Sequence, residues 1–337
     1  MKQIYLFLII ILFIAGCFNP PATQNQATKI LDLSGSDYET DLDYPYLYIA
    51  ARTEGLLRII LSNNNYTIEN LPLLDSVQNV IPVEYVTANG NDIVALSSNN
   101  IWHSTDSGYT WENINHGINI PFELTALSRS PVEFEKLFVI SQGDSMYYSP
   151  DNGEHWQTGI YAGHSTYYNS YWNPCISGDI WFDGLGQLGW PFYGCVENHG
   201  QISKVFDQAN VPEINNYSGF VFSQNRIYIS NLLQTKSCFY YSEDEGSSWS
   251  EMEQTLDDST YIDYFIKDQL TSGTFYLATN NNILISSDTL RTFNKVCEFS
   301  NNTDDDFAYK LYHEAINNFL IITTTQNSIY LYNLNEN

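Results

Sequence analysis

The sequence has few positive charges. Its 337 residues include 13 Lys and Arg against 39 Asp and Glu, which gives a formal net charge of −26. A surface this acidic repels phosphate groups, which argues against nucleic-acid binding and against a basic patch for anionic lipid. Charged residues make up 15 % of the chain and aromatic residues another 15 %. This balance favours β-structure over helical bundles and coiled coils.

Motifs for catalysis and for metal binding are also missing. The chain has no Cys-x-x-Cys and no His-Glu-x-x-His, and its six His residues are scattered. It has neither a nucleophile elbow nor a glycine-rich phosphate loop. We therefore expect no metal, no other cofactor and no catalytic residue. A carboxylate pair for glycoside hydrolysis stays open among the 39 acids, with Asp179 and Asp183 as first candidates.

Long apolar runs are confined to the N-terminus. Lys2 precedes an apolar run from Ile4 to Ala15, which is short for a membrane span and closes on Ile14-Ala15-Gly16-Cys17. This pattern predicts an export signal over residues 1–16, with an uncleaved signal anchor as the alternative. The stretch resembles the lipobox of bacterial lipoproteins, and the resemblance implies that Cys17 becomes the lipidated N-terminus.

The residues that follow Cys17 predict a flexible tether. Residues 17–27 are rich in Pro, Gln and Asn and carry no charge. With the lipid they would hold the protein at the bacterial cell envelope, on its periplasmic or extracellular side. Phe18 is not the Asp that retains some lipoproteins at the inner membrane, so we favour the outer membrane.

The middle of the chain contains a repeated eight-residue segment. Three copies read S-x-D-x-G-x-x-W and begin at Ser104, Ser149 and Ser242. The starts differ by 149 − 104 = 45 and 242 − 149 = 93 residues, so the second gap predicts a worn copy, at Val196–Ser203. Further copies lie at Leu61–Ile68 and Ser286–Phe293. Units of about 40–50 residues with four short strands each are typical of propellers.

The chemistry of the repeat indicates a structural clip. The Ser ends one strand, the Asp accepts hydrogen bonds from the turn, the Gly supplies a positive φ, and the Trp covers the hairpin. The residues at these positions are Ser104, Asp106, Gly108, Trp111, Ser149, Asp151, Gly153, Trp156, Ser242, Asp244, Gly246, Trp249 and Asp288.

These segments resemble the Asp-box (BNR) repeat family, known from sialidases, sortilin-type receptors, xyloglucanases and the photosystem II assembly factor. The resemblance implies an all-β β-propeller over residues 28–337, with each box on the hairpin that joins the outer two strands of a blade. We expect seven four-stranded blades, with six or eight as alternatives. Thr28–Asp37 is assigned as the first strand of the first unit.

The same resemblance bears on activity. A sialidase needs three Arg to clamp a carboxylate, and this chain has five Arg and no N-terminal Arg-Ile-Pro signature. Arg58 lies inside a predicted strand, which is the wrong place for such a clamp. We therefore do not expect a sialidase, and we expect a non-enzymatic scaffold for protein binding or assembly. The alternative is a carbohydrate-binding or glycoside-hydrolase propeller that acts on extracellular glycans.

In such propellers ligands usually bind on the face opposite the boxes. The longest aromatic loops on that face predict a surface that binds a protein side chain or a sugar. The alternative is that these side chains pack between blades. The residues of this predicted ligand face are Tyr161, His164, Tyr168, Trp172 and Trp190. Cys175 and Cys195 form either a disulfide or two free thiols. Cys238 and Cys297 lie in strand-like runs, so we expect them to be buried.

Overall fold

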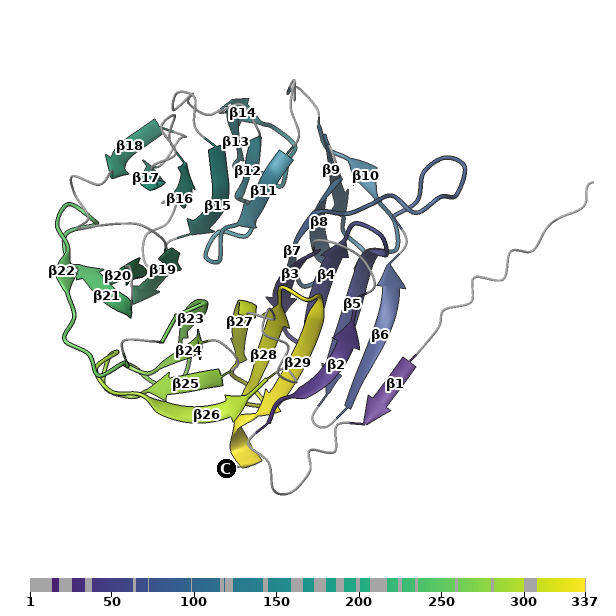
Figure 1. Ribbon diagram of the computed structural model, residues 1–337. Helices are drawn as coiled ribbons and strands as arrows, with labels where there is room; N and C mark the ends of the chain where they lie inside the picture. Colours follow the sequence, from purple (N-terminus) through teal and green to yellow (C-terminus); the bar gives the residue numbers. More distant parts are fainter. Residues whose placement is uncertain are drawn as a thin grey trace, which may run out of the picture.

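The computed structural model shows a ring of small antiparallel sheets (Figure 1). It describes residues 14–17, 26–33, 38–62, 65–71, 73–97, 99–115, 118, 124–141, 145–158, 166–172, 180–185, 191–197, 201–206, 217–223, 226–233, 236–257, 260–279, 282–299 and 308–336. These residues form strands and one 3₁₀ turn, η1 (Leu334–Glu336). None of their helices is long and apolar enough to cross a membrane.

The first sheet has five strands in the order β1-β6-β5-β4-β3. Their bounds are β1 (Ile14–Cys17), β3 (Tyr38–Asp43), β4 (Tyr46–Ala51), β5 (Gly55–Ser62) and β6 (Asn65–Leu71). The end of the predicted export signal is therefore a strand, β1, that pairs with β6 from Ile14↔Ile68 to Cys17↔Asn65.

Five further sheets each consist of four consecutive strands. Their strands are β7 (Tyr85–Asn89), β8 (Asp92–Ser97), β9 (Asn100–Ser104), β10 (Glu112–Asn113); β11 (Leu124–Arg129), β12 (Leu137–Ser141), β13 (Ser145–Ser149), β14 (Gln157–Thr158); β15 (Thr166–Trp172), β16 (Ile180–Leu185), β17 (Pro191–Glu197), β18 (Gln201–Phe206); β19 (Tyr217–Ser223), β20 (Arg226–Leu233), β21 (Lys236–Ser242), β22 (Ser250–Glu251); and β23 (Tyr264–Lys267), β24 (Phe275–Thr279), β25 (Asn282–Ser286), β26 (Asn294–Glu298).

The last sheet joins the two ends of the chain. Its strands are β27 (Ala308–Glu314), β28 (Phe319–Thr324), β29 (Ser328–Asn333) and β2 (Thr28–Asp32), and β2 pairs with β29 from Thr28↔Leu331 to Asp32↔Ser328. The assignment of Thr28–Asp37 to the first unit is therefore wrong. The C-terminal unit supplies only three strands, so its open edge takes the N-terminal strand and the ring closes.

The strand counts correct one expectation. Six sheets are four-stranded blades of the predicted kind, and six blades was one of the alternatives to the expected seven. The expectation of seven four-stranded blades is not met in that form, because β1 adds a fifth strand to the remaining sheet.

The core lies between neighbouring sheets. The second strand of a sheet is buried along nearly its whole length, for example in β8, β12 and β28. These strands are continuous apolar runs because both of their faces are covered. One cluster joins the first and last sheets through Leu47, Ile49 and Ile321, all 0 % exposed. Each sheet thus depends on its neighbours for a core.

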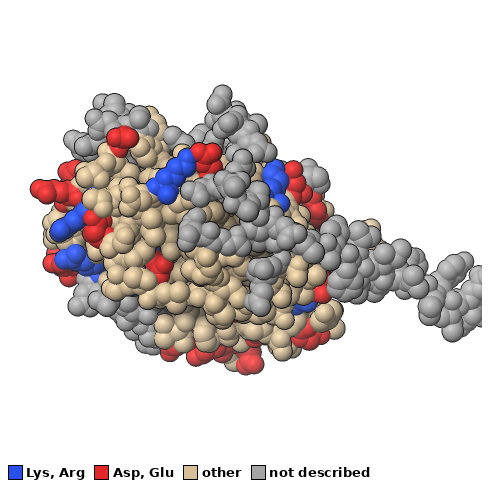
Figure 2. Space-filling model, turned by 90° about the horizontal axis from the view of Figure 1, so that it is seen from below, with Lys and Arg blue, Asp and Glu red and all other residues tan. Residues whose placement is uncertain are grey.

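The two faces of the ring differ in which loops they carry. On one face, here called the box face, lie the hairpins between third and fourth strands and the loops between first and second strands. On the other, the entry face, the chain enters each first strand and turns from the second strand to the third. Acidic side chains are prominent at the edges of the side seen in Figure 2, and several basic side chains lie beside them.

Candidate functional site

The repeated segments form hairpins with one hydrogen-bond pattern. Each Ser ends a third strand and is at most 2 % exposed in Ser104, Ser149, Ser242 and Ser286. Ser104 Oγ donates to Asp106 Oδ1 (2.9 Å) and accepts from the backbone N–H of Gly108 (2.8 Å). The hairpins at Ser149, Ser242 and Ser286 repeat both bonds at 2.7–2.9 Å. The pattern satisfies buried turn groups, as the predicted clip requires.

The sequence interpretation missed one position of the segment that also takes part in the hydrogen bonds of the hairpin. In the first copy, Thr110 donates its backbone N–H to Asp106 Oδ1 (2.8 Å) and its hydroxyl to Asp106 Oδ2 (2.6 Å). The corresponding partners in the other copies are His155, Ser248 and Thr292. A recurring hydroxyl at this place is the sequence signal that could have revealed it.

These bonds shift the pKa values of the box carboxyls. Hydrogen bonds from the hydroxyl and the backbone N–H of Thr110 lower the pKa of Asp106 to about 2. Hydrogen bonds from the backbone N–H and hydroxyl of Thr292 lower the pKa of Asp288 to about 2 in the same way. These carboxyls are therefore charged over the physiological range, and their charge is used to hold a turn.

The boxes also join neighbouring sheets. Gly108 has φ +88°, and a Cβ built on it would lie 3.0 Å from Leu71 Cδ1 of the preceding sheet. Gly153 has φ +87°, and its Cβ would lie 2.3 Å from Ile114 Cδ1, again in the preceding unit. Glycine is therefore required both for the backbone conformation and for close approach. Leu290 takes the glycine position of the copy at Ser286 with φ 63° and is 0 % exposed.

The Trp side chains support the same junctions. Trp111 is half-buried against the cluster that contains Leu71, and Trp156 Nε1 donates to Ile114 O at 2.8 Å. Trp249 is half-buried as well. These contacts fasten the boxes at Ser104 and Ser149 to the sheets that precede them.

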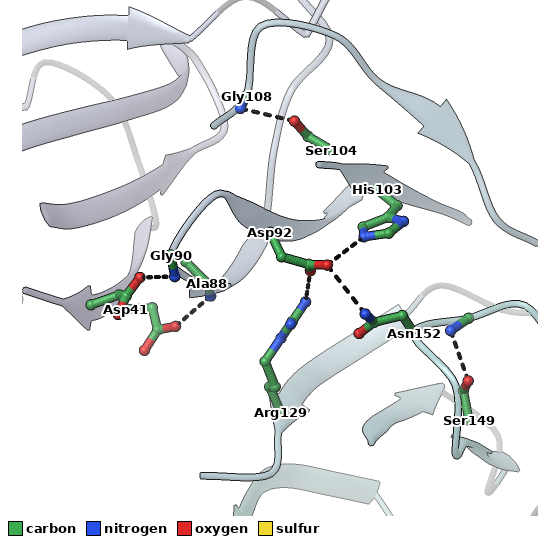
Figure 3. Close-up of polar contacts among 12 residues, drawn as sticks. Asp41, Ala88, Gly90, Asp92, His103, Ser104, Gly108, Arg129, Ser149 and Asn152 are labelled. Atoms are coloured by element: carbon green, nitrogen blue, oxygen red, sulfur yellow. Dashed lines mark hydrogen bonds and ion pairs between the residues drawn. The ribbon is translucent and has the colours of Figure 1, made fainter. Parts of the chain in front are cut away.

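A polar network centred on Asp92 lies at one of these junctions (Figure 3). Its Oδ1 accepts from Arg129 Nη2 of the next sheet, and its Oδ2 accepts from Asn152 Nδ2 of that sheet's box at 3.1 Å. His103 Nε2 lies 3.1 Å from the same Oδ2. Burial alone would raise the pKa of Asp92, but His103 and Arg129 outweigh it, so the pKa is lowered. The network couples two blades through side chains of both.

One group of possible metal ligands lies in a box. The ligand atoms of Asp151, Glu154 and His155 lie within 4.8 Å of one another. Asp151 already accepts from Ser149 and from the backbone of His155, and its Oδ2 lies 2.7 Å from His155 Nδ1. The side chain of His155 is 81 % exposed. These contacts account for the group as part of the turn.

The entry face carries a pocket. Its volume is about 370 Å³, within the range of small-ligand pockets. The lining comes from the starts of β3 and β7 and from two turns that follow second strands; its residues are Tyr38, Glu39, Arg52, Glu84, Tyr85, Thr325 and Asn327. This entry-face pocket thus joins the first, second and last sheets.

Charge in the entry-face pocket is paired. Arg52 Nη2 lies 3.9 Å from Glu84 Oε1, and the Arg52 side chain is 46 % exposed while that of Glu84 is 10 % exposed. Glu39 contacts Lys310 Nζ, and their side chains are 14 % and 26 % exposed. Tyr85 forms part of the wall, and burial, with a smaller effect of Glu39, raises its pKa. The pocket therefore presents aromatic surface beside fixed charges of both signs.

Polar side chains tie together the strands that carry the pocket residues. Tyr38 donates its hydroxyl to Thr324 O at 2.9 Å, which ties β3 to the turn after β28. Asp41 Oδ2 accepts from the backbone N–H of Ala88 at 2.8 Å, which ties β3 to β7. Burial raises the pKa of Asp41 and that of Tyr312. The pocket is therefore preorganised by contacts among the innermost strands.

The predicted ligand face is only partly covered by the structure. Tyr161, His164 and Trp190 lie outside the described residues. The backbone places Tyr168 near the start of β15 and Trp172 at its last position, on the box-face end. The candidate acid Asp179 also lies outside the described residues, while Asp183 lies in β16.

The cysteines divide in the same way. Cys175 lies outside the described residues and Cys195 lies in β17, so the Cys175–Cys195 disulfide stays a prediction. Cys238 and Cys297 are both 0 % exposed, which confirms that they are buried. Burial raises the pKa of Cys297.

Four described arginines lie in separate places and pair with separate carboxylates. Arg58 lies in β5, as expected, with 4 % of its side chain exposed, and pairs with Glu69. Arg52, Arg129 and Arg226 pair with Glu84, Asp92 and Glu243 in three other places. These described Arg side chains are thus dispersed around the ring, and each is engaged with its own carboxylate.

Comparisons with known proteins establish the fold. No family model matches the sequence, and no curated protein matches it. The structure titled "YCF48 bound to D1 peptide" is similar at 15 % identity and TM-score 0.67, over 93 % of this chain and 98 % of that chain. The WD40 domain of Neurospora crassa Pan2 is similar at 11 % identity and TM-score 0.62, over 94 % and 93 %.

A third similar structure is an ancestral GH74 enzyme, at 12 % identity and TM-score 0.61. The match covers 91 % of this chain but only 46 % of the enzyme, so this chain spans about half of that protein. At these identities the similarities concern architecture alone. The chain is an all-β propeller built of four-stranded blades.

Proposed function

We propose that this protein is a non-enzymatic scaffold of the bacterial cell envelope that binds a protein partner on its entry face. The observation that carries the proposal is the preorganised pocket formed by Tyr38, Glu39, Arg52, Glu84 and Tyr85. Its tyrosines offer amphipathic contact surface, and its ion pairs offer donors and acceptors at fixed positions. The similar YCF48 structure, which is described as bound to a peptide, supports a propeller of this shape as a protein-binding unit.

The envelope anchor rests on the sequence. Gly16-Cys17 at the end of the apolar run supports cleavage before Cys17 and lipidation of that residue. Cleavage there would remove Ile14, Ala15 and Gly16 from β1 and leave β3–β6 as a four-stranded blade. We infer that the processed chain is a ring of seven four-stranded Asp-box blades tethered by residues 17–27.

A second candidate is a carbohydrate-active propeller. Glu39 and Glu84 line one pocket beside two tyrosines, which is the kind of set that binds or cleaves a sugar. The GH74 similarity supports this candidate only at the level of architecture. Both carboxylates contact a basic side chain, whereas a glycoside hydrolase needs one carboxyl that donates its proton to the leaving oxygen. Recognition is therefore the better supported role.

The test combines a glycan array with capture from detergent-solubilised envelopes. Wild type, Arg52→Ala and Arg291→Ala should be compared, because Arg291 is an exposed Arg on the box face and serves as the matched control. We expect a protein partner that Arg52→Ala loses and Arg291→Ala keeps. Strong glycan binding or glycan cleavage without a protein partner would support the second candidate instead.

A further inference from the structure

The loops that join first and second strands on the box face differ in length and content. The β7–β8 hairpin needs only Gly90 and Asn91, so the fold itself can make this connection with two residues. The β11–β12, β23–β24 and β27–β28 loops are longer. Their extra residues are therefore not required to close the sheets.

These three loops share one capping arrangement. Ser130 Oγ accepts the backbone N–H groups of the residues two and three positions later, at 3.3 and 3.1 Å. Asp268 Oδ1 does the same at 2.7 Å for both bonds. Glu314 accepts the two equivalent bonds on Oε1 and Oε2 at 2.6 and 2.8 Å. The three caps are only 2 %, 5 % and 2 % exposed.

Each cap holds a large aliphatic side chain out of the fold. The residue two positions after the cap is Val132, Leu270 or Ile316, with 49 %, 63 % and 74 % exposure. Fixing an apolar residue in water costs free energy, because its surface stays hydrated while its loop is ordered. A rigid exposed apolar tip is typical of a contact surface.

Two of these tips are adjacent. His313, at 2 % exposure, lies with Nδ1 3.7 Å from Asp268 Oδ2 and accepts from the backbone N–H of Gln269 at 3.4 Å. Its Nε2 lies 3.0 Å from Asn318 Oδ1 of the next loop. The buried His313 therefore holds together the loops that carry Leu270 and Ile316.

The surface of this pair carries no charge. The side chains around the tips are neutral, and they are Gln269, Thr271, Ser272, Ala315, Asn317 and Asn318. On a chain of net charge −26 an uncharged area with two exposed aliphatic tips is unusual. A groove of about 530 Å³ begins beside it at Ser272 and Gly273. The groove runs between the β19–β22 sheet and the β23–β26 sheet, and its lining includes Glu243 and Arg226.

The rim of this area is acidic. Asp244 and Asp288 are exposed in the neighbouring boxes, with the exposed Arg291 in the same box as Asp288. Hydrogen bonds with Ser248 and Thr292 lower the pKa values of the two carboxyls, so both are charged at neutral pH. An anionic bilayer or a second copy of this chain would meet like charge here. A basic partner would meet complementary charge, and its apolar residues would cover the exposed tips.

We propose that Leu270, Ile316 and the adjoining groove form a docking platform for an extended segment of a partner protein, one that carries aliphatic or aromatic side chains flanked by Lys or Arg. The platform lies on the face opposite the entry-face pocket. Together with the partner proposed for the entry face, on which this step rests, the platform would let the protein join two partners, one on each face of the ring.

The test uses the purified full chain and short synthetic peptides of alternating composition. Leu–Lys, Leu–Ser, Ser–Lys and Leu–Glu peptides are titrated by fluorescence anisotropy against wild type and Leu270→Asn/Ile316→Asn. We expect the Leu–Lys peptide to bind most tightly and the double variant to lose about tenfold or more in affinity, as for a central apolar contact.

Matched controls are available on the same chain. Val132→Asn alters the same kind of capped tip in another blade, and Val77→Asn alters a residue 72 % exposed elsewhere, so both should bind the Leu–Lys peptide as wild type does. Arg52→Ala should also leave this affinity unchanged, which separates the platform from the entry-face pocket. Thermal unfolding of each variant should match wild type, because these positions are exposed.

Several results would overturn the platform. Equal binding of the Leu–Lys peptide to the double variant, equal binding of Leu–Glu, or no binding of any peptide would each do so. Retention of the protein on phosphatidylcholine and phosphatidylglycerol vesicles through Leu270 and Ile316 would indicate a bilayer instead. Self-association in sedimentation velocity that the double variant abolishes would indicate a second copy.

Discussion

Removing Asp92 should destabilise the ring more than removing an exposed acid. Arg129 has 3 % of its side chain exposed, and among the described residues its Nε and Nη1 have no hydrogen-bond partner. Asp92→Leu would therefore leave a buried guanidinium without its carboxylate. Breaking a buried ion pair on one side costs about 3–5 kcal/mol. Because the Asp92 side chain is still 23 % exposed, we expect a loss of about 3 kcal/mol.

A double-mutant cycle checks this reasoning. Urea and thermal unfolding should be measured for Asp92→Leu, Arg129→Met and the double variant, and the first should lower Tm by roughly 5 °C. The double variant should recover most of the loss, since an apolar pair can replace a buried ion pair at little cost. Glu298→Gln is the control: its Lys295 pair is 45 % and 56 % exposed, so the change should stay within about 0.5 kcal/mol.

The explanation of the network fails on either of two results. If Asp92→Leu unfolds like wild type, the pair does not join the blades. If the double variant is as unstable as Asp92→Leu, the loss comes from packing or from the contacts of Asp92 with His103 and Asn152.

Three further predictions concern the boxes. Gly153→Ala should cost about 2–4 kcal/mol in unfolding free energy, because φ is +87° and the new Cβ would meet Ile114. Gly90→Ala is the control and should cost about 1 kcal/mol, because nothing lies within 4 Å of its new Cβ. Equal costs for the two variants would refute the close approach of Gly153 to Ile114. Ser149→Ala should lower the unfolding free energy by about 1–3 kcal/mol by leaving the Gly153 N–H unsatisfied, and a value near zero would contradict the clip. The pKa of Asp106 is lowered to about 2 in the folded chain. The ionised carboxylate therefore stabilises the fold above its ordinary pKa near 4, and this stabilisation is lost as the pH falls from 4 towards 2. Unfolding of Asp106→Asn measured against pH should lack this part of the acid dependence, and a profile like that of wild type would refute the role of the carboxylate.

The architecture could be predicted because each repeated turn is determined by residues close together in the sequence. Ser, Asp, Gly and Trp of each box act within one hairpin, so a repeated spelling predicts a repeated turn. The edge pairing of β2 could not be predicted in this way. Thr28–Asp32 has an ordinary strand pattern, and its place depends on the open edge of β29, about three hundred residues away in sequence.

The pocket and the inter-blade role of the boxes escaped the sequence for the same reason. Tyr38, Arg52, Glu84 and Asn327 come from four separate turns or strand ends, and no spacing links them. Gly153 meets Ile114 only because the ring brings consecutive units together. The aromatic loops that drew attention in the sequence lie outside the described residues or at both ends of β15.

The central claim is that the entry face binds a protein. The most direct measurement is site-specific photo-crosslinking in intact envelopes, with the crosslinker at Thr325 in the pocket lining and, as control, at Glu112, whose side chain is 71 % exposed on β10. We expect a discrete protein adduct from position 325 that Arg52→Ala removes and that position 112 does not give. Adducts that are absent at 325, or identical at both positions, would contradict the claim.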